Sequence, residues 1–271
     1  MDDLSHSATC RLTEAAVRLS ARGRFAEAEE YLLRAAEFLR RSGIYPESAT
    51  VWNQLGMVCK YLGKFHSAER YYRQALRCAG QLEGQKRNHL LADLFHNLGG
   101  VEHSRGRFAS GERYARKGLR LRLQFSAAGS PAVASDLAGL AAILYGLGKI
   151  DEAGKLYRRA LGIYRRHFGA NHAEIAVVLN NLGSLFQASG RPERAEEYYR
   201  GALRMKRRVL GDAHPDLALT MNNLATLLCA QGRPSGGRQW FRKALQLAND
   251  SLGRLHPVTR CIRANHDRLR V

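Results

Sequence analysis

A glycine followed by a basic residue recurs along the chain at a nearly constant spacing. Successive glycines are separated by 40, 43, 42, 42 and 42 residues. They stand in the pairs Gly23-Arg24, Gly63-Lys64, Gly106-Arg107, Gly148-Lys149, Gly190-Arg191 and Gly232-Arg233. A period near 42 is typical of stacked supersecondary repeats, none of which can bury its apolar face without its neighbours. The chain is therefore predicted to be a repeat array, and its function is expected on a long shared surface.

Small and apolar residues keep a fixed register to these glycines. Leucine stands eight residues before the glycine in five of the six repeats, at Leu55, Leu98, Leu140, Leu182 and Leu224. Alanine or glycine stands five residues after it in every repeat, at Ala28, Ala68, Gly111, Ala153, Ala195 and Gly237. Aromatic residues such as Tyr71 and Trp240 lie between the small ones at helical spacing. These rows predict two closely packed helices in each repeat, with the aromatic side chains in the core.

The second repeat carries the pattern of a known family. Trp52, Leu55 and Gly56, followed by Ala68 and Tyr72, resemble the tetratricopeptide pattern of Trp-x2-Leu-Gly in a first helix and Ala-x3-Phe in a second. The ordinary tetratricopeptide repeat has about 34 residues. The longer repeat of this chain resembles the kinesin light chain type, most plainly over residues 210–224.

This resemblance implies an all-α fold. The expected architecture is a right-handed α-α superhelix, a tetratricopeptide (TPR) solenoid of six helical hairpins plus a C-terminal helix near Val258–Leu269. We expect a single domain over residues 1–271. Its repeats are placed at about 9–44, 45–85, 86–129, 130–171, 172–213 and 214–255, with a capping segment at 256–271. Pro46, Pro131, Pro215 and Pro257 are expected to open first helices, and Pro192 and Pro234 second helices.

Three histidines share the period of the repeat. His172, His214 and His256 are 42 residues apart. Helices packed side by side hold equivalent residues roughly 10 Å apart, whereas zinc needs its ligands within about 2.1 Å of one ion. We therefore interpret these histidines as helix-entry residues and expect no metal and no cofactor.

Cysteine usage and the N-terminus indicate a cellular compartment. The five cysteines, an odd number, form no Cys-x-x-Cys pair, so no disulfide framework is expected. Asp2 and Asp3 stand where a signal peptide would carry positive charge. No uncharged apolar run approaches the roughly 18 residues of a membrane span. We expect a reducing, cytoplasmic location and no membrane span.

Motifs of catalysis are absent from the sequence. It holds no Gly-rich phosphate loop, no His-Glu-x-x-His and no Gly-x-Ser-x-Gly elbow. Gly99-Gly100 lies at the Leu-Gly position of a first helix, which indicates close packing rather than a phosphate cradle. The chain is expected not to be an enzyme and to have no catalytic residues.

The family resemblance implies a binding groove lined by the first helices, which usually takes an extended peptide or a helix of a partner. The groove positions ten and nine residues before each glycine carry Asn53-Gln54, His96-Asn97, Ala138-Gly139, Asn180-Asn181 and Asn222-Asn223. An amide offers two donors and a carbonyl acceptor, so a row of amides can pair with a peptide backbone without reading its sequence. The alternative is that the asparagine nine residues before the glycine bonds the backbone of the neighbouring repeat.

Repeat 4 interrupts this row of amides with Ala138, Gly139 and Ala142. Small residues leave room for a bulky ligand side chain, and kinesin light chains are known to bind a tryptophan flanked by acids. Drift at an unused position is the alternative. The predicted function is a non-enzymatic protein-protein interaction scaffold, whose partner protein presents an acidic or extended peptide segment.

A basic surface supports a second hypothesis. The chain has 43 Lys+Arg against 24 Asp+Glu and a formal net charge of +19. Arginine stands ten residues after the glycine in five repeats, at Arg73, Arg116, Arg158, Arg200 and Arg242. A positive stripe of this kind could bind nucleic acid or another polyanion, or it could simply be a solvated outer face. Nucleic-acid or polyanion binding through these arginines is the alternative function.

Overall fold

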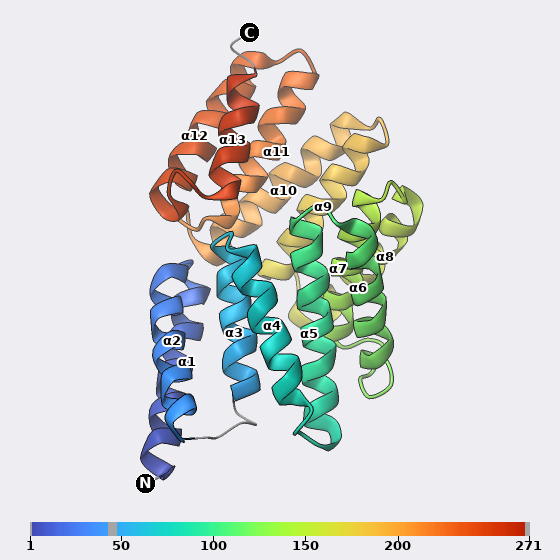
Figure 1. The fold of residues 1–271 in the computed structure, drawn as a ribbon. Coiled ribbons are helices and arrows are strands. Elements are labelled where there is room, and N and C mark those ends of the chain that lie inside the picture. The colour runs from blue at the N-terminus through green and yellow to red at the C-terminus, as the bar shows by residue number, and fades with distance from the viewer. Residues whose placement is uncertain (1, 43–47, 269–271) are drawn as a thin grey trace. The chain divides into compact units, whose positions relative to one another are not determined.

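The computed structural model describes residues 2–42 and 48–268, and for residues 2–6, 41 and 42 only the backbone (Figure 1). Every regular element in these ranges is an α-helix, which confirms the all-α prediction. The chain divides into two compact units, Met1–Ala128 and Gly129–Val271, called here the N-terminal and the C-terminal unit.

The N-terminal unit contains three helical hairpins. They are formed by α1 (Asp2–Ala21) with α2 (Phe25–Ser42), α3 (Ser48–Tyr61) with α4 (Phe65–Ala79), and α5 (Gly84–Ser104) with α6 (Phe108–Arg122). Within this unit α2 also packs on α3 and α4 on α5, and the first helices α1, α3 and α5 contact one another in order. Each first helix is therefore held by its own partner and by its neighbours.

The C-terminal unit repeats this arrangement and adds one helix. Its hairpins are α7 (Pro131–Gly146) with α8 (Ile150–Phe168), α9 (Ala173–Ala188) with α10 (Pro192–Leu210), and α11 (Asp216–Ala230) with α12 (Pro234–Leu252). The helix α13 (Pro257–Asp267) packs on both α11 and α12, in the place of a further first helix. The structure thus confirms the six hairpins and the C-terminal helix.

The six glycines that recur before a basic residue are called here the marker glycines, and they form the turns inside the hairpins. Each has a positive φ, between 69° for Gly190 and 75° for Gly148. This left-handed conformation costs glycine little and other residues more. The glycine therefore ends the first helix, and the basic residue after it precedes the second.

Close helix contacts explain the glycines that follow the periodic leucine in first helices. A Cβ atom built on Gly183 would lie 2.7 Å from the ring of the buried Tyr199, and Gly56 lies against Tyr72 in the same way. The prediction for the aromatic residues was only partly right. Tyr71 and Trp240 are half-buried beside the core, whereas the fully buried rings, such as Tyr72 and Phe241, stand one residue later. Helical periodicity located the face but not which of two adjacent aromatics points inward.

Most of the prolines that were expected to open helices stand at helix starts. Pro131, Pro192, Pro234 and Pro257 are the first residues of α7, α10, α12 and α13, and Pro215 directly precedes α11. Pro46, the boundary expected at residues 44 and 45, and the expected helix end at Leu269 lie outside the described residues.

Candidate functional site

The first helices carry the predicted groove residues. In the N-terminal unit, the Nδ2 of Asn97 on α5 donates to Oδ1 of Asn53 on α3, over 2.9 Å. Asn53 is buried, and Asn97 and its neighbour His96 are half-buried. Asn53 stands ten residues before Gly63, and Asn97 stands nine residues before Gly106. The pairing therefore joins these two register positions in successive repeats.

The same pairing recurs in the C-terminal unit, where five amides on α13, α11 and α9 form a continuous chain. Asn265 on α13 donates to Asn222 on α11 over 3.0 Å, and Asn222 donates to its neighbour Asn223 over 3.4 Å. Asn223 then donates to Asn180 on α9 over 3.2 Å, and Asn180 donates to Asn181 over 3.3 Å. We call these residues (Asn180, Asn181, Asn222, Asn223 and Asn265) the amide chain.

The amide chain ends at repeat 4. Asn181 is hydrogen-bonded to the hydroxyl of the buried Tyr157 on α8, whose pKa is raised by burial. In α7 the corresponding positions are Ala138 and Gly139, with Ala142 one turn further along the helix, and all three are half-buried. They have no polar side chain to continue the chain.

Asn265 is a residue that the sequence analysis missed. It was assigned to the capping segment, yet it lies 42 residues after Asn223, in the register of the repeat. This periodicity was the available signal. The amides also bond to side chains of the neighbouring repeat rather than to its backbone, which neither sequence hypothesis stated.

A titratable group lies on the first helix α5. Burial and the charge of Lys60 lower the pKa of His103, so its imidazole is neutral near pH 7. The ring of His103 also packs edge-on against Phe108. His103 therefore contributes an uncharged aromatic ring to the surface of this first helix.

The periodic histidines cap helices. The Nδ1 atoms of His172, His214 and His256 accept hydrogen bonds from the backbone N–H groups of Glu174, Asp216 and Val258, over 3.3, 3.2 and 3.1 Å. This confirms their interpretation as helix-entry residues. Nδ1 can accept only when it is unprotonated, and burial lowers the pKa of His214, which favours that form.

The predicted arginine row lies on the second helices, and much of it is paired. Three of the five arginines form ion pairs with a glutamate four residues earlier: Arg73 with Glu69, Arg116 with Glu112 and Arg200 with Glu196. Gly154 and Arg238 stand at that position before Arg158 and Arg242. Part of the basic charge is therefore neutralised within the same helix.

Two further observations bear on function. Within residues 2–42 and 48–268, no helix is both long and apolar enough to cross a membrane. The described residues also hold no group of three His, Cys, Asp or Glu side chains arranged to bind a metal ion.

Comparison with known proteins places this geometry in a family. A family model described as Tetratricopeptide repeat matches residues 10–81, 90–166, 133–208 and 174–250. The chain matches no curated protein.

Solved structures show the same fold. BtubC (BKLC) from P. vanneervenii is similar with a TM-score of 0.57 and 24% identity, over 94% of this chain and 93% of that one. The Rap conjugation gene regulator of plasmid pLS20, solved with the Phr* peptide, has a TM-score of 0.66 and 17% identity, over 81% and 56%. A putative kinesin light chain of Podosopora anserina has a TM-score of 0.53 and 15% identity, over 77% and 98%. The chain, with repeats similar to those of kinesin light chains, belongs to the tetratricopeptide repeat family.

Proposed function

We propose that this chain is a non-enzymatic protein-interaction scaffold that binds a peptide or a helix of a partner protein in a groove lined by first helices. The observation that carries the proposal is the amide chain, which crosses α9, α11 and α13 on the first-helix side. A similar structure, the Rap regulator, holds a peptide, which supports the assignment to peptide binding.

The amide chain leaves hydrogen-bonding capacity for a ligand. Asn180 and Asn223 each use one amide hydrogen and one oxygen lone pair in the chain, whereas an asparagine side chain has two of each. The remaining donor and acceptor match the C=O and N–H of a peptide backbone. Both asparagines are half-buried, so water reaches them in the free protein.

Repeat 4 supplies the complementary feature. Ala138, Gly139 and Ala142 present little side chain beside the end of the amide chain at Asn181. We infer that a bulky side chain of the bound peptide occupies this place. The formal net charge of +19 favours a partner segment with acidic residues. The cytoplasmic location expected from the cysteines stays a prediction.

The test begins with a peptide obtained by selection. A displayed library of random twelve-residue peptides is selected on the purified chain, and the best binder is measured by fluorescence anisotropy. Because a net hydrogen bond contributes about 0.5–1.5 kcal/mol, Asn181→Ala should weaken binding about two- to tenfold. The Asn180→Ala/Asn181→Ala/Asn223→Ala variant should nearly abolish it, and Ala142→Trp should block it sterically.

Arg158→Glu is the matched control on a second helix. It should change binding less than Asn181→Ala, with the helical circular-dichroism signal of all variants unchanged. Binding that survives the triple asparagine variant but is lost on Arg158→Glu/Arg200→Glu would place the site on the other helices and refute the proposal.

The basic alternative, nucleic-acid or polyanion binding, is supported by the charge excess and by Arg158 and Arg242, which lack a glutamate four residues earlier. The ion pairs of Arg73, Arg116 and Arg200 weigh against it. If six or more phosphates were contacted, affinity for a DNA or RNA oligonucleotide would fall by about three decades or more between low and moderate salt. A flat salt dependence would exclude this alternative.

A further inference from the structure

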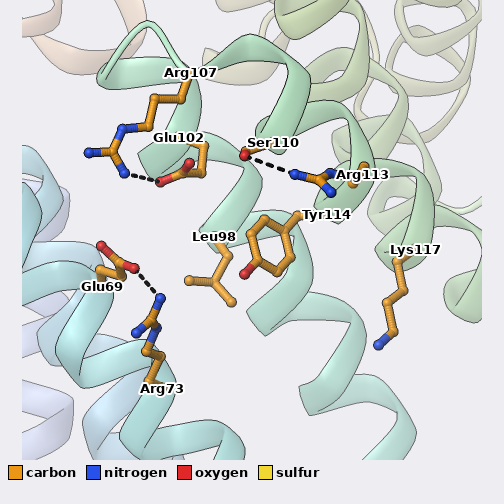
Figure 2. A pocket seen from close by; sticks show the side chains of 9 residues that line it. All are labelled: Glu69, Arg73, Leu98, Glu102, Arg107, Ser110, Arg113, Tyr114 and Lys117. Atoms are coloured by element: carbon orange, nitrogen blue, oxygen red, sulfur yellow. Dashed lines mark hydrogen bonds and ion pairs between the residues drawn. The ribbon is translucent and has the colours of Figure 1, made fainter.

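A cavity of about 470 Å³ lies in the N-terminal unit, among α4, α5 and α6 (Figure 2). Figure 2 shows Leu98 and Tyr114 at its centre, with charged side chains around them. Four cations line it, Arg73 from α4, Arg107 from the turn before α6, and Arg113 and Lys117 from α6. The cavity is formed mainly by second helices, so it is not part of the first-helix groove.

An ion-pair network adjoins this cavity through Glu69 and Glu102, which line it. The guanidinium of Arg105 bonds Glu69 on α4 and lies 3.5 Å from Glu102 on α5. The residue Glu102 is only 7% exposed, and the side chain of Arg105 8%. The network therefore ties one hairpin to the next through buried charges.

An acid at the register position of Glu102 is peculiar to repeat 3. The other repeats place Leu19, Cys59, Leu144, Phe186 and Leu228 at the register position of Glu102. Burying two charges costs several kcal/mol of desolvation free energy for each ion, and an apolar pair of similar volume is often as stable or more so. Stability alone therefore does not account for Glu102 and Arg105, which suggests a role at the cavity.

The two carboxylates orient cations at the edge of the cavity. Glu69 holds Arg73 at 2.6 Å, and Glu102 lies 3.9 Å from Arg107. Both carboxylates are shared with Arg105, so they do not neutralise all the cations around them. The cavity thus keeps an excess of positive charge.

The remaining two cations, Arg113 and Lys117, contact a hydroxyl and an aromatic ring. Arg113 donates to the hydroxyl of Ser110 over 3.3 Å, and the Nζ of Lys117 lies 4.3 Å from the centre of the Phe95 ring. Neither forms an ion pair with a carboxylate in the part of the chain whose side chains are described. Both side chains are exposed and therefore accessible to an anionic ligand.

The spacing of these cations indicates the form of the ligand. With a rise of 1.5 Å per helical residue, Arg113 and Lys117 are separated by about 6 Å along α6, and Arg107 and Lys117 by about 15 Å. A single phosphate or carboxylate is too small to reach all three. In an extended peptide, alternate side chains lie on one side about 6.6–6.8 Å apart, which matches the first of these separations.

We propose that the cavity among α4, α5 and α6 is a second peptide-binding site, which takes an extended segment with acidic residues at alternate positions. Carboxylates of that segment pair with Arg113 and Lys117, while Arg73 and Arg107 lie at the edge. The site is independent of the first-helix groove and does not require it.

The probe is a fluorescein-labelled peptide of alternating glutamate and serine, measured by anisotropy with the full chain. We expect Arg113→Gln/Lys117→Gln to weaken its binding about tenfold or more, because hydrogen bonds to charged groups are the strong ones. The matched control is Lys155→Gln/Arg159→Gln, which removes the same charge at the same register of repeat 4. Equal weakening by both variants would overturn the proposal, because it would show attraction by net charge alone.

Further arms test the ligand and the independence of the site. A peptide of the same composition with its glutamates consecutive should bind more weakly, and equal affinity would overturn the spacing argument. Displacement of the peptide by low concentrations of inorganic phosphate would show a simple anion site instead. Tighter binding of a single-stranded RNA with the same charge, lost in the same variant, would show a nucleic-acid site. Asn181→Ala should leave the glutamate peptide bound, so failure of either site is distinguishable from failure of the other.

Discussion

The first-helix surface of the C-terminal unit and the second-helix cavity of the N-terminal unit both carry polar networks across repeats, but by different chemistry. The amide chain is neutral, and every member donates to the next. The network of Glu69, Glu102 and Arg105 is charged and partly buried. Neutral amides can recur in many repeats at a modest desolvation cost, whereas buried ions need all their partners at once. This difference explains why the amides recur, whereas a buried acid such as Glu102 stands at that register in one repeat.

The largest effect should come from removing the central cation. Arg105→Ala leaves Glu102 and Glu69 without their shared partner in a buried place, and breaking such a pair costs about 3–5 kcal/mol of unfolding free energy. Urea unfolding followed by circular dichroism measures the change. Arg40→Ala removes an exposed pair with Glu37 and serves as the control, for which no measurable change is expected. A small effect at Arg105 would mean that water solvates these carboxylates.

Replacing the whole ion pair should have the opposite result. Glu102→Leu/Arg105→Leu installs the residues that repeat 4 carries as Leu144 and Leu147. Because well-packed apolar residues often equal or exceed a buried ion pair, stability should be unchanged or increase by about 1–4 kcal/mol. Affinity for the alternating glutamate peptide should fall, because Glu102 no longer orients Arg107 and because Glu69, without Arg105, neutralises Arg73 more fully. A lower melting temperature with unchanged peptide binding would assign the pair a purely structural role.

Breaking the amide chain should cost less than Arg105→Ala. Asn222→Ala removes the most buried member and leaves the donor of Asn265 and the acceptor of Asn223 without their partner. The expected loss of unfolding free energy is about 1–3 kcal/mol. Ser189→Ala, which removes a bond to Leu185 inside a single helix, should change stability less. Equal effects would show that the amide chain does not couple repeats.

The smallest effect should be the pH dependence that separates the two networks. Burial would raise the pKa of Glu69, but the hydrogen bond from Arg105 and the charges of Arg73 and Arg105 outweigh it, and the pKa lies below 4.5. Its stabilisation is therefore complete above about pH 4.5 and is lost as the pH falls through the lower, folded value. The stability difference between Arg105→Ala and the parent chain should narrow in acid.

The difference between Asn222→Ala and the parent should stay constant over the same pH range, because amides do not titrate. Thermal melts between pH 7 and pH 3.5 measure both differences. A parallel pH dependence of the two variants would contradict the distinction between the networks.

Local rules made much of the fold predictable. The marker glycines, the small residues against Tyr72 and Tyr199, and the histidine caps each depend on contacts within a hairpin or a turn. The polar networks depend on which residues of successive repeats face each other. The sequence located Asn180 and Asn223 on first helices, but their hydrogen bond joins residues 43 apart, and that offset comes from how α9 packs on α11.

The buried charges were the least predictable feature. Arginine and glutamate are usually exposed, and nothing local in Glu102-His103-Ser104-Arg105 indicates burial. The departure from the apolar residues at that register in the other repeats was visible, and it was the one signal that could have found the cavity. The predicted arginine row included Arg73 but none of the other three cations that line it.

The length of the amide chain depends on how many successive repeats carry a pair of consecutive asparagines. Each repeat with consecutive asparagines accepts a hydrogen bond from the next repeat and passes it to the previous one, so repeats 5 and 6 are interchangeable modules in this respect. An inserted copy of repeat 5 would lengthen the amide chain by one helix-packing distance, roughly 10 Å. The amide chain ends at repeat 4, because Ala138 and Gly139 stand there in place of asparagines. The length of the amide chain could therefore be changed by adding or removing whole repeats.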